Sequence, residues 1–400
     1  MNFILFDDPK IHKSLYPFTL TRPVGSLRLG ILTLAEKWER ALGLNASYHS
    51  AAYLSDLFPL KTTADNLLVN SSVIPDENIV TSILKLPSGS ILENEQHILA
   101  VHSGKENIPT LGDLPERGNL KSIYFRHPVK FITRPWDLFL ENSNELLRDF
   151  IMLTSGRQTK NMPDPYTRTY HERNVFIEDG AKIRAAVINA EDGPVYIGNN
   201  AQIREGSLIC GPAAILEGAE LSMGVKIRPN TTIGPYCKVG GEIKNSIIYG
   251  YSNKAHDGYL GNSVVGEWCN LGADTNCSNL KNNYSSVSVW DYGSESFQDS
   301  GQQFCGTFIG DHSRTSIGTM INTGTVIGVS ANVFGAGLTP KFIPSFTWGG
   351  HSGSVEYDIE KAIDSAGKMM ALRKKIISQK EAGLLKYVYE HTRKYRHFEK

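Results

Sequence analysis

Aliphatic residues recur every six positions through the second half of the chain. The series runs without a slip through Ile197, Ile203, Ile209, Ile215, Leu221, Ile227, Ile233 and Val239. An α-helix repeats every 3.6 residues and a half-buried strand every two, so neither produces this spacing. A solenoid does, because each short strand points one aliphatic side chain inward before the chain turns a corner. The spacing therefore predicts a parallel β-helix in which about three hexads complete one triangular coil.

The same spacing sets the limits of the predicted β-helix. It returns at Val265 and Leu271, and again at Ile321, Ile327 and Val333. We therefore expect the β-helix over residues 175–347, with a non-periodic loop inserted over residues 274–306. Insertions in repeat proteins project from one face and often build the binding site.

The rest of the chain lacks the six-residue spacing. Residues 1–153 mix apolar runs with helix-like stretches such as 31–42 and 137–150, which predicts an α/β layer domain. Residues 154–174 are rich in polar residues and prolines and are expected to form a linker. Residues 348–400 are expected to form a helical tail, because the apolar residues of 359–370 stand at helical spacing.

The composition limits the binding partners and the cellular compartment that we expect. Lys plus Arg and Asp plus Glu balance at 41 each, so no global field would recruit nucleic acid or a membrane surface. No apolar stretch is long enough to predict a membrane-spanning helix. All five cysteines lie in the predicted β-helix, in odd number and without a CxxC pair. This pattern favours free thiols and a cytoplasmic location.

The strongest chemical signal lies between residues 253 and 279. His256 begins a His-x-x-Tyr-Leu-Gly stretch, Asn270 begins Asn-Leu-Gly-Ala, and Thr275 and Asn279 form Thr-x-x-x-Asn. In this order the motifs resemble the acetyltransferase half of the bifunctional glucosamine-1-phosphate acetyltransferase/N-acetylglucosamine-1-phosphate uridylyltransferase family. The resemblance implies a left-handed β-helix of hexapeptide repeats that uses acetyl-CoA as co-substrate. It also implies an amino-sugar 1-phosphate acceptor, with glucosamine 1-phosphate the first candidate.

The resemblance also assigns roles to individual residues. It makes His256 the general base. It implies that the sugar phosphate is held by Arg228, Lys244, Tyr259 and Asn270, and that the acyl carrier lies near Ala273, Asn279, Lys281 and Arg314. The residue types suit these roles, because a neutral imidazole titrates near working pH and cationic side chains pair with phosphate.

Two alternatives compete with this interpretation of His256. A lone histidine can simply cap a corner of the solenoid, and asparagine ladders also satisfy solenoid turns. Some β-helices bind zinc through three histidines that meet between subunits, but the periodic region supplies only His256 and His312. The zinc alternative is therefore the weaker of the two.

The N-terminal domain resembles a divergent, short sugar nucleotidyltransferase. The marks are Leu-Phe-Asp-Asp at residues 5–8, Leu-Thr-Arg-Pro-Val at 20–24 and Glu-Lys-Trp at 36–38. The resemblance implies nucleotide binding by Arg22, Arg28 and Lys37, with Mg²⁺ as an ion this domain would use. No glycine-rich phosphate loop follows the first strand. Nucleotide transfer, nucleotide binding without chemistry, and assembly therefore all stay open, and a salt-bridged structural role is the alternative for Arg22.

Together these features predict a transferase with two activities in cell-envelope precursor synthesis. The β-helix would acetylate an amino-sugar 1-phosphate, and the N-terminal domain would transfer the nucleotidyl group of UTP or dTTP onto a sugar 1-phosphate. The alternative is a nucleotidyltransferase or nucleotide-sugar binding protein whose β-helix is an oligomerisation scaffold. A triangular prism leaves flat outer faces, so we expect a homotrimer, with no nucleic acid or membrane partner.

Overall fold

The computed structural model describes residues 1–104, 120–162, 164–350 and 353–398. The chain forms two compact units. The first comprises Met1–Arg28 and Leu32–Arg134, and the second comprises Leu29–Ile31 and everything from Pro135 onward.

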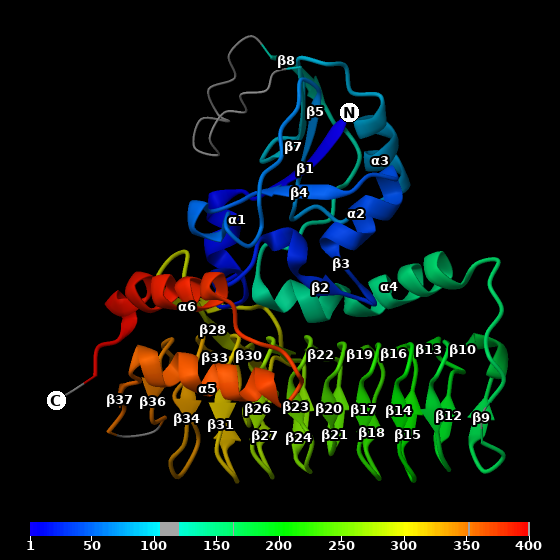
Figure 1. Ribbon diagram of the computed structural model, residues 1–400, viewed down its shortest axis with the longest axis vertical. Coiled ribbons are helices and arrows are strands. Elements are labelled where there is room, and N and C mark those ends of the chain that lie inside the picture. The colour runs from blue at the N-terminus through cyan, green and yellow to red at the C-terminus, as the bar shows by residue number, and fades with distance from the viewer. Residues whose placement is uncertain (105–119, 163, 351–352, 399–400) are drawn as a thin grey trace. The chain divides into compact units, whose positions relative to one another are not determined.

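The first unit is built on a mixed six-stranded sheet (Figure 1). Its strand order is β4-β1-β5-β7-β6-β8, and only β7 runs antiparallel to its neighbours. The bounds are β1 (Asn2–Phe6), β4 (Ala46–His49), β5 (Asn66–Asn70), β6 (Ser90–Glu93), β7 (Ile98–Ser103) and β8 (Lys121–Tyr124). A two-stranded ribbon pairs β2 (Arg28–Leu29) with β3 (Leu32–Thr33).

Helices and two apolar layers complete this unit. The helices are α1 (Pro9–Ser14), α2 (Leu34–Leu42) and α3 (Glu77–Leu84), with short 3-10 turns η1 (Phe18–Leu20), η2 (Val24–Ser26) and η3 (Ala52–Leu54). A capping box of Thr33 and Glu36 starts α2, and Gly43 ends it in the left-handed conformation that glycine adopts without strain. Alternate residues of β1 enter opposite layers, Phe3 and Leu5 on one side and Ile4 and Phe6 on the other. The predicted α/β domain is confirmed.

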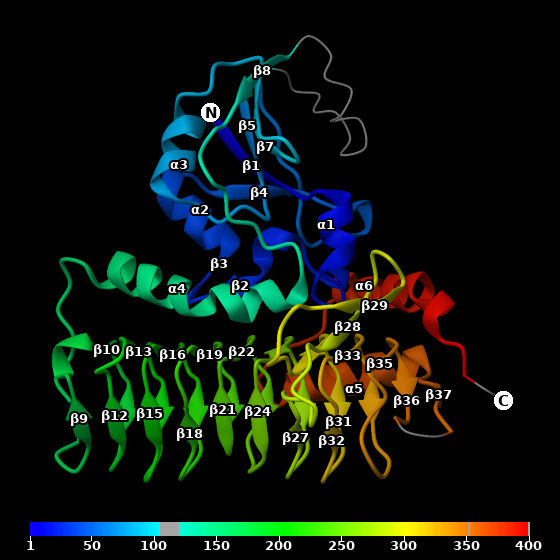
Figure 2. The ribbon, with the colours of Figure 1, turned by 180° about the vertical axis from the view of Figure 1, so that it is seen from behind.

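The second unit is a left-handed parallel β-helix with three faces (Figure 2). The first face comprises β10 (Val175–Ile177), β13 (Val195–Ile197), β16 (Ala213–Ile215), β19 (Thr231–Ile233), β22 (Ile247–Ile248), β25 (Val264–Val265), β30 (Thr307–Ile309), β33 (Thr325–Ile327) and β35 (Phe342–Ile343). The second face comprises β11 (Lys182–Ile183), β14 (Gln202–Ile203), β17 (Glu220–Leu221), β20 (Lys238–Val239), β23 (Asn253–Lys254), β26 (Asn270–Leu271), β31 (Arg314–Thr315), β34 (Asn332–Val333), β36 (Thr347–Trp348) and the antiparallel edge strand β37 (Val355–Glu356). The third face comprises β9 (Arg168–Tyr170), β12 (Val187–Asn189), β15 (Leu208–Cys210), β18 (Lys226–Ile227), β21 (Glu242–Lys244) and β24 (Tyr259–Gly261), followed by the pair β27 (Asn276–Cys277) and β32 (Met320–Ile321).

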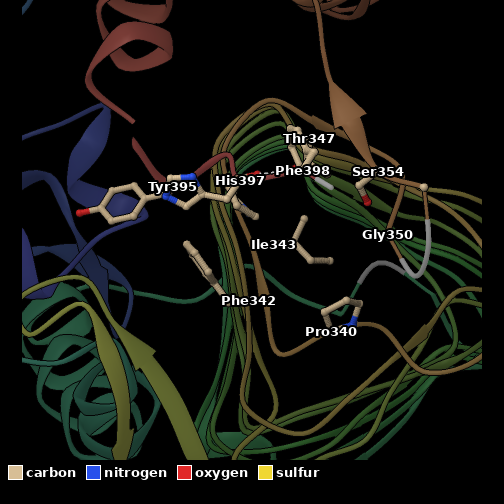
Figure 3. Close-up of a pocket in the computed structure, with 11 residues that line it drawn as sticks. Pro340, Phe342, Ile343, Thr347, Gly350, Ser354, Tyr395, His397 and Phe398 are labelled. Carbon is tan, nitrogen blue, oxygen red and sulfur yellow. Dashed lines mark hydrogen bonds between the residues drawn. The ribbon is translucent and has the colours of Figure 1, made fainter. Parts of the chain in front are cut away.

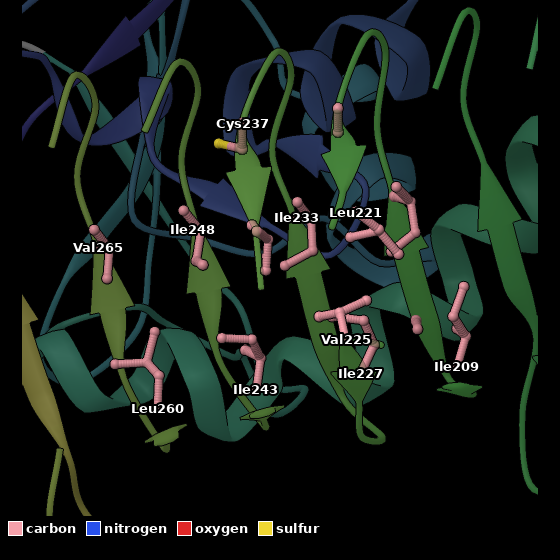
Figure 4. Packing of buried hydrophobic residues seen from close by; sticks show 14 of the residues in the cluster. Ile209, Leu221, Val225, Ile227, Ile233, Cys237, Ile243, Ile248, Leu260 and Val265 are labelled. Carbon is pink, nitrogen blue, oxygen red and sulfur yellow. The ribbon is translucent and has the colours of Figure 1, made fainter. Parts of the chain in front are cut away.

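The six-residue series forms the core of this solenoid. All eight aliphatics from Ile197 to Val239 are buried in one continuous cluster, as are the later members of the series. Figure 4 shows part of this cluster, including Leu221, Ile227 and Ile233. The spacing fails after Val239 because a short corner, Gly240–Gly241, brings the next inward residue, Ile243, after only four positions. The fold predicted from the spacing is confirmed.

Helix α4 (Pro135–Thr154) belongs with the β-helix, so the structure divides the chain at 134/135, whereas we expected 153/154. Buried polar side chains explain the difference. Asn142 Oδ1 accepts the Gly30 N–H at 2.8 Å, and Asn142 Nδ2 donates to the Asn230 carbonyl of the β-helix at 2.9 Å. Gly30 has a φ of 77°, and a Cβ there would lie 2.5 Å from an Asp149 carboxylate oxygen.

The β-helix also begins earlier than residue 175. Residues 168–170, which we expected in the linker, form β9 and pair in register with β12. Backbone hydrogen bonds, which the spacing of side chains does not reveal, place this strand on the third face.

The inserted loop is shorter than predicted. Residues 274–277 still complete a coil, since Cys277 pairs with Ile321 on β32. The chain leaves the solenoid after Asn279 and returns at Cys305, whose N–H donates to the Asn279 carbonyl at 2.9 Å. Between them lies a hairpin of β28 (Ser288–Asp291) and β29 (Ser296–Asp299), whose Trp290 stacks on Phe342 of β35.

The tail contains two helices, α5 (Ile359–Ala371) and α6 (Gln379–His391), and the turn η5 (Arg393–Tyr395). Helix α5 lies over the second face, where its Met369 and Met370 pack against Trp268 (Figure 1). All five cysteines are free thiols, four of them buried and Cys210 half-buried, as predicted. Among the described residues, no helix combines the length and apolar character needed to cross a membrane.

Candidate active site

Two cationic side chains lie on neighbouring rungs of the third face. Ile227 pairs with Ile243, so Arg228 stands level with Lys244, which in turn pairs with Gly261. Both Arg228 and Lys244 are exposed. Neighbouring strands lie about 4.8 Å apart, so the two side chains leave the face close enough to share one anion. The structure therefore places two predicted phosphate ligands together.

Tyr259 stands on the next rung of the same face, opposite Glu242. Its hydroxyl accepts a hydrogen bond from Asn279 Nδ2 at 3.1 Å, and the same amide nitrogen donates to Asn262 Oδ1 at 2.8 Å. Burial raises the pKa of Tyr259, so the phenol stays protonated and can donate to a ligand. Tyr259 and Asn279 are thus in direct contact, although we expected them to hold different substrates.

His256 lies on the corner that joins the second face to the third. We call residues 255–258, between β23 and β24, the His256 corner. The His256 side chain is exposed. The next coil stacks directly on this corner, because the Asp274 N–H donates to the Asp257 carbonyl at 3.1 Å. Ala273 therefore lies beside His256 along one edge of the prism.

Three other predicted residues lie elsewhere. Asn270 stands on the second face, where Asn253 Nδ2 approaches its Oδ1 at 3.4 Å. Arg314 lies on the same face and donates to the Ser365 carbonyl of α5 at 2.9 Å. Lys281 lies in the inserted loop and donates to the Ser286 carbonyl. The structure does not group these three side chains with Arg228, Lys244 and Tyr259.

In the first unit, a buried carboxylate organises the carboxyl end of β1. Asp7 accepts the Val24 N–H at 3.1 Å and contacts His12 Nδ1 at 3.0 Å. The contact through Val24 places Arg22, two residues earlier, near the carboxyl end of β1, where open α/β sheets bind ligands. Arg22 is buried, at 6% exposure, which suits the structural alternative as well as a ligand role.

The other two predicted nucleotide ligands come from different elements. Arg28 begins β2 and is half-buried, whereas Lys37 is buried on α2. Magnesium sites use carboxylate ligands. The Asp7 carboxylate is already engaged, and the Asp8 carboxylate caps α1 by accepting the Lys10 and Ile11 N–H groups. This donor set does not fit a magnesium ion.

Three polar residues near the site have no role predicted from the sequence. Glu242 pairs with Arg228 at 3.0 Å, and Asn262 joins Tyr259 and Asn279. Lys254 is buried inside the solenoid. The burial of Lys254 could have been predicted from the sequence. The lysine stands six positions after Ile248 and six before Leu260, which makes its position in the six-residue spacing an inward one.

A separate cavity of about 470 Å³ lies at the C-terminal end of the β-helix (Figure 3). Its lining includes Ile343, Thr347, Tyr395, His397 and Phe398. None of the described residues that line this cavity is a predicted site residue.

The chain is similar to known proteins over parts of its length. A family model for sugar nucleotidyl transferases matches residues 3–158. A bifunctional sugar-1-phosphate nucleotidylyltransferase/acetyltransferase from Sulfurisphaera tokodaii is 36% identical over 40% of this chain and 37% of its own length. An uncharacterized acetyltransferase, YaiX, from Escherichia coli is 30% identical over 44% of this chain and 75% of its own length. The chain belongs to the family of this acetyltransferase, and its residues 3–158 are similar to sugar nucleotidyl transferases.

The family resemblance given by the motifs is thereby confirmed. The match spans little more than a third of the length of the S. tokodaii relative. Among solved structures, a UDP-N-acetylglucosamine acyltransferase from Campylobacter jejuni is 15% identical over 56% of this chain and 94% of its own. Its TM-score of 0.23 is too low to add to the family assignment.

Proposed function

We propose that the β-helix transfers an acetyl group from acetyl-CoA to an amino-sugar 1-phosphate, with glucosamine 1-phosphate the first candidate. The proposal rests on a group of side chains that lie on the third face and at its edge. Arg228 and Lys244 stand on adjacent rungs, Tyr259 follows on the next, and His256 lies on the adjoining corner. The relatives named as acetyltransferases support the same reaction class.

The proposed chemistry assigns one task to each part of this group. Arg228 and Lys244 hold the phosphate, the first as a planar fork and the second as a mobile charge. His256 takes the proton as the acceptor amine bonds to the acetyl carbon. The carbon–sulfur bond then breaks, and the imidazolium returns the proton to the departing thiolate. Tyr259, Asn270 and Asn279 would orient the two substrates.

The acyl carrier would lie along the same edge, near Ala273. The oxyanion that forms on the acetyl group would need a hydrogen-bond donor on this edge. In the turn of residues 271–273, the Gly272 N–H already donates to the Thr315 carbonyl at 3.1 Å. Lys281 and Arg314 stay proposed ligands of the CoA phosphates. Arg314 would have to exchange its contact with α5 for that role.

For the first unit we propose nucleotidyl transfer from UTP or dTTP onto a sugar 1-phosphate, with Arg22, Arg28 and Lys37 at the nucleotide. The sugar nucleotidyl transferase model over residues 3–158 supports this activity. The second candidate is nucleotide or nucleotide-sugar binding without transfer. Its support is the absence of a glycine-rich loop after β1 and the burial of Arg22 and Lys37.

Assembly and cellular setting complete the proposal. We propose a homotrimer in UDP-N-acetylglucosamine biosynthesis, located in the cytoplasm, where the free thiols would stay reduced. Exposed apolar side chains flank the His256 edge, including Met223 at 72% and Ile317 at 79% exposure, and a neighbouring prism would cover them. Light scattering coupled to gel filtration tests the trimer, and a 44.2 kDa monomer would contradict it.

A substrate panel tests the acetyl transfer directly. Purified protein is incubated with acetyl-CoA and each of several hexosamine 1-phosphates, and free thiol release is followed. We expect release that depends on an amino group on the sugar. Thiol release that ignores the sugar, or none with any sugar, would contradict the proposal.

A further inference from the structure

An ionisable side chain occupies the aliphatic interior of the solenoid just before the His256 corner. Lys254 pairs with Val239 on the preceding rung of the second face, and Val239 belongs to the continuous core cluster. Lys254 is 1% exposed. Lysine is almost never fully buried unless it finds partners, because removing its charge from water is costly. A lysine at an inward hexad position therefore needs an explanation.

The partners of the amine are both on the His256 corner. Lys254 Nζ donates to the His256 carbonyl at 2.6 Å and to the Asp257 carbonyl at 3.0 Å. The amine thus reaches the corner from inside the solenoid while the imidazole leaves it on the outside. Burial lowers the pKa of Lys254 to about 8, although the nearby Asp257 and Asp274 carboxylates oppose that change.

Three other corners on the same edge are closed by a hydroxyl group. Four residues after the inward position, a hydroxyl donates to the carbonyl three residues before it. Ser207 donates to Arg204 at 2.6 Å, Thr275 to Gly272 at 2.7 Å and Thr319 to Ser316 at 2.8 Å.

At the His256 corner the matching position is Gly258, which has no hydroxyl and a φ of 119°. Glycine there leaves the backbone unusually free. The bonds from Lys254 supply the restraint that a serine or threonine supplies at those three corners.

We propose that Lys254 is a positioning residue that holds the His256 corner, and hence the imidazole, in the geometry needed for proton transfer. The inference rests on the proposed acetyl transfer. A general base must stay within hydrogen-bond reach of the proton it takes, and a displacement of about 1 Å can cost a hundredfold in rate. Lys254 would therefore act on the rate through His256 without touching the substrate.

The test compares two variants of Lys254 with a matched corner variant. Lys254→Met keeps the length and volume but removes the donor, and Lys254→Gln keeps N–H donors on a shorter side chain. Ser207→Ala removes the corner hydrogen bond three coils earlier, where no predicted site residue lies. For each protein we would measure kcat, KM for the amino-sugar phosphate, and hydrogen exchange of the amides at residues 255–258.

We expect Lys254→Met to lower kcat by roughly ten- to a hundredfold with KM within about threefold of wild type. The kcat of Lys254→Gln should lie between those of wild type and Lys254→Met. Exchange at 255–258 should accelerate in Lys254→Met and stay as in wild type in Ser207→Ala. Normal kcat or unchanged exchange in Lys254→Met would overturn the proposal. If wild type shows no acetyl transfer, the proposed function fails instead, and exchange alone decides whether Lys254 holds the corner.

Discussion

The β-helix and the N-terminal unit place their candidate ligands in contrasting ways. On the β-helix, a residue's place in the hexad decides whether its side chain enters the core or leaves the surface, so Arg228 and Lys244 are exposed and adjacent. In the N-terminal unit, Arg22 and Lys37 are buried among loops and helices that no repeat aligns. In a repeat, the position of a residue in the sequence therefore predicts which residues lie beside it, whereas in a single α/β layer it does not.

The largest expected effect follows from removing the exposed base, His256. His256→Ala should lower acetyl transfer by roughly 10²–10⁴-fold, the usual contribution of a positioned general base. Its thermal stability should barely change, because the imidazole is exposed and outside the hexad core. Steady-state kinetics and a melting curve on the same preparation check both statements. Near-normal turnover, or an unfolded protein, would show that the histidine is structural.

The N-terminal unit should respond to loss of Arg22. With no glycine-rich loop, guanidinium groups are the available means of neutralising triphosphate charge, so Arg22→Ala should lower pyrophosphate release by about 10²–10³-fold. Acetyl transfer should stay unchanged. Because Arg22 is buried, Arg22→Lys serves as the control that retains the charge. If wild type releases no pyrophosphate with any nucleotide, the unit is a binder, and if both variants unfold, Arg22 is structural.

The two units also differ in how far the sequence could predict them. The hexad residues determined the β-helix, its three faces and the exposure of Arg228 and Lys244. The six-residue spacing could not predict that β9 joins the third face or that α4 packs on the β-helix. Hydrogen bonds of the backbone and of buried side-chain amides determine both placements. The covering of the second face by α5 likewise follows from tertiary contacts, such as that between Arg314 and Ser365.

The site could be predicted only in part for a similar reason. Motif order brought out Tyr259 and Asn279 but could not reveal that they share a hydrogen bond, since they stand 20 positions apart. Lys254 was visible as a lysine in phase with Ile248 and Leu260. Its partners were not, because a side chain of that length can fold back to its own corner or reach across the core.

A pH series would sharpen the contrast between inward and outward lysines. The pKa of Lys254 is about 8 in the folded protein, below its ordinary value of 10.5. Between these pH values the unfolded chain binds more protons, so stability rises with pH. From pH 8 to 10.5, the wild-type free energy of unfolding should rise by up to about 3 kcal/mol relative to that of Lys254→Met. Below pH 8, the two proteins should show the same dependence of this free energy on pH. Urea titrations of both proteins at five pH values measure it, and parallel curves throughout would contradict a buried amine.

The smallest expected effect concerns an outward lysine, Lys244. A phosphate contact made equally in the ground and transition states changes KM and leaves kcat alone. Lys244→Ala should therefore raise KM for the amino-sugar phosphate about tenfold, the usual range for one charged hydrogen bond. Lys226→Ala is the matched control, because Lys226 is exposed, pairs with Glu242 on the next rung and stands two positions before Arg228. Equal KM values for both variants would remove Lys244 from the phosphate site, and a loss of kcat would mean that the lysine acts on the transition state.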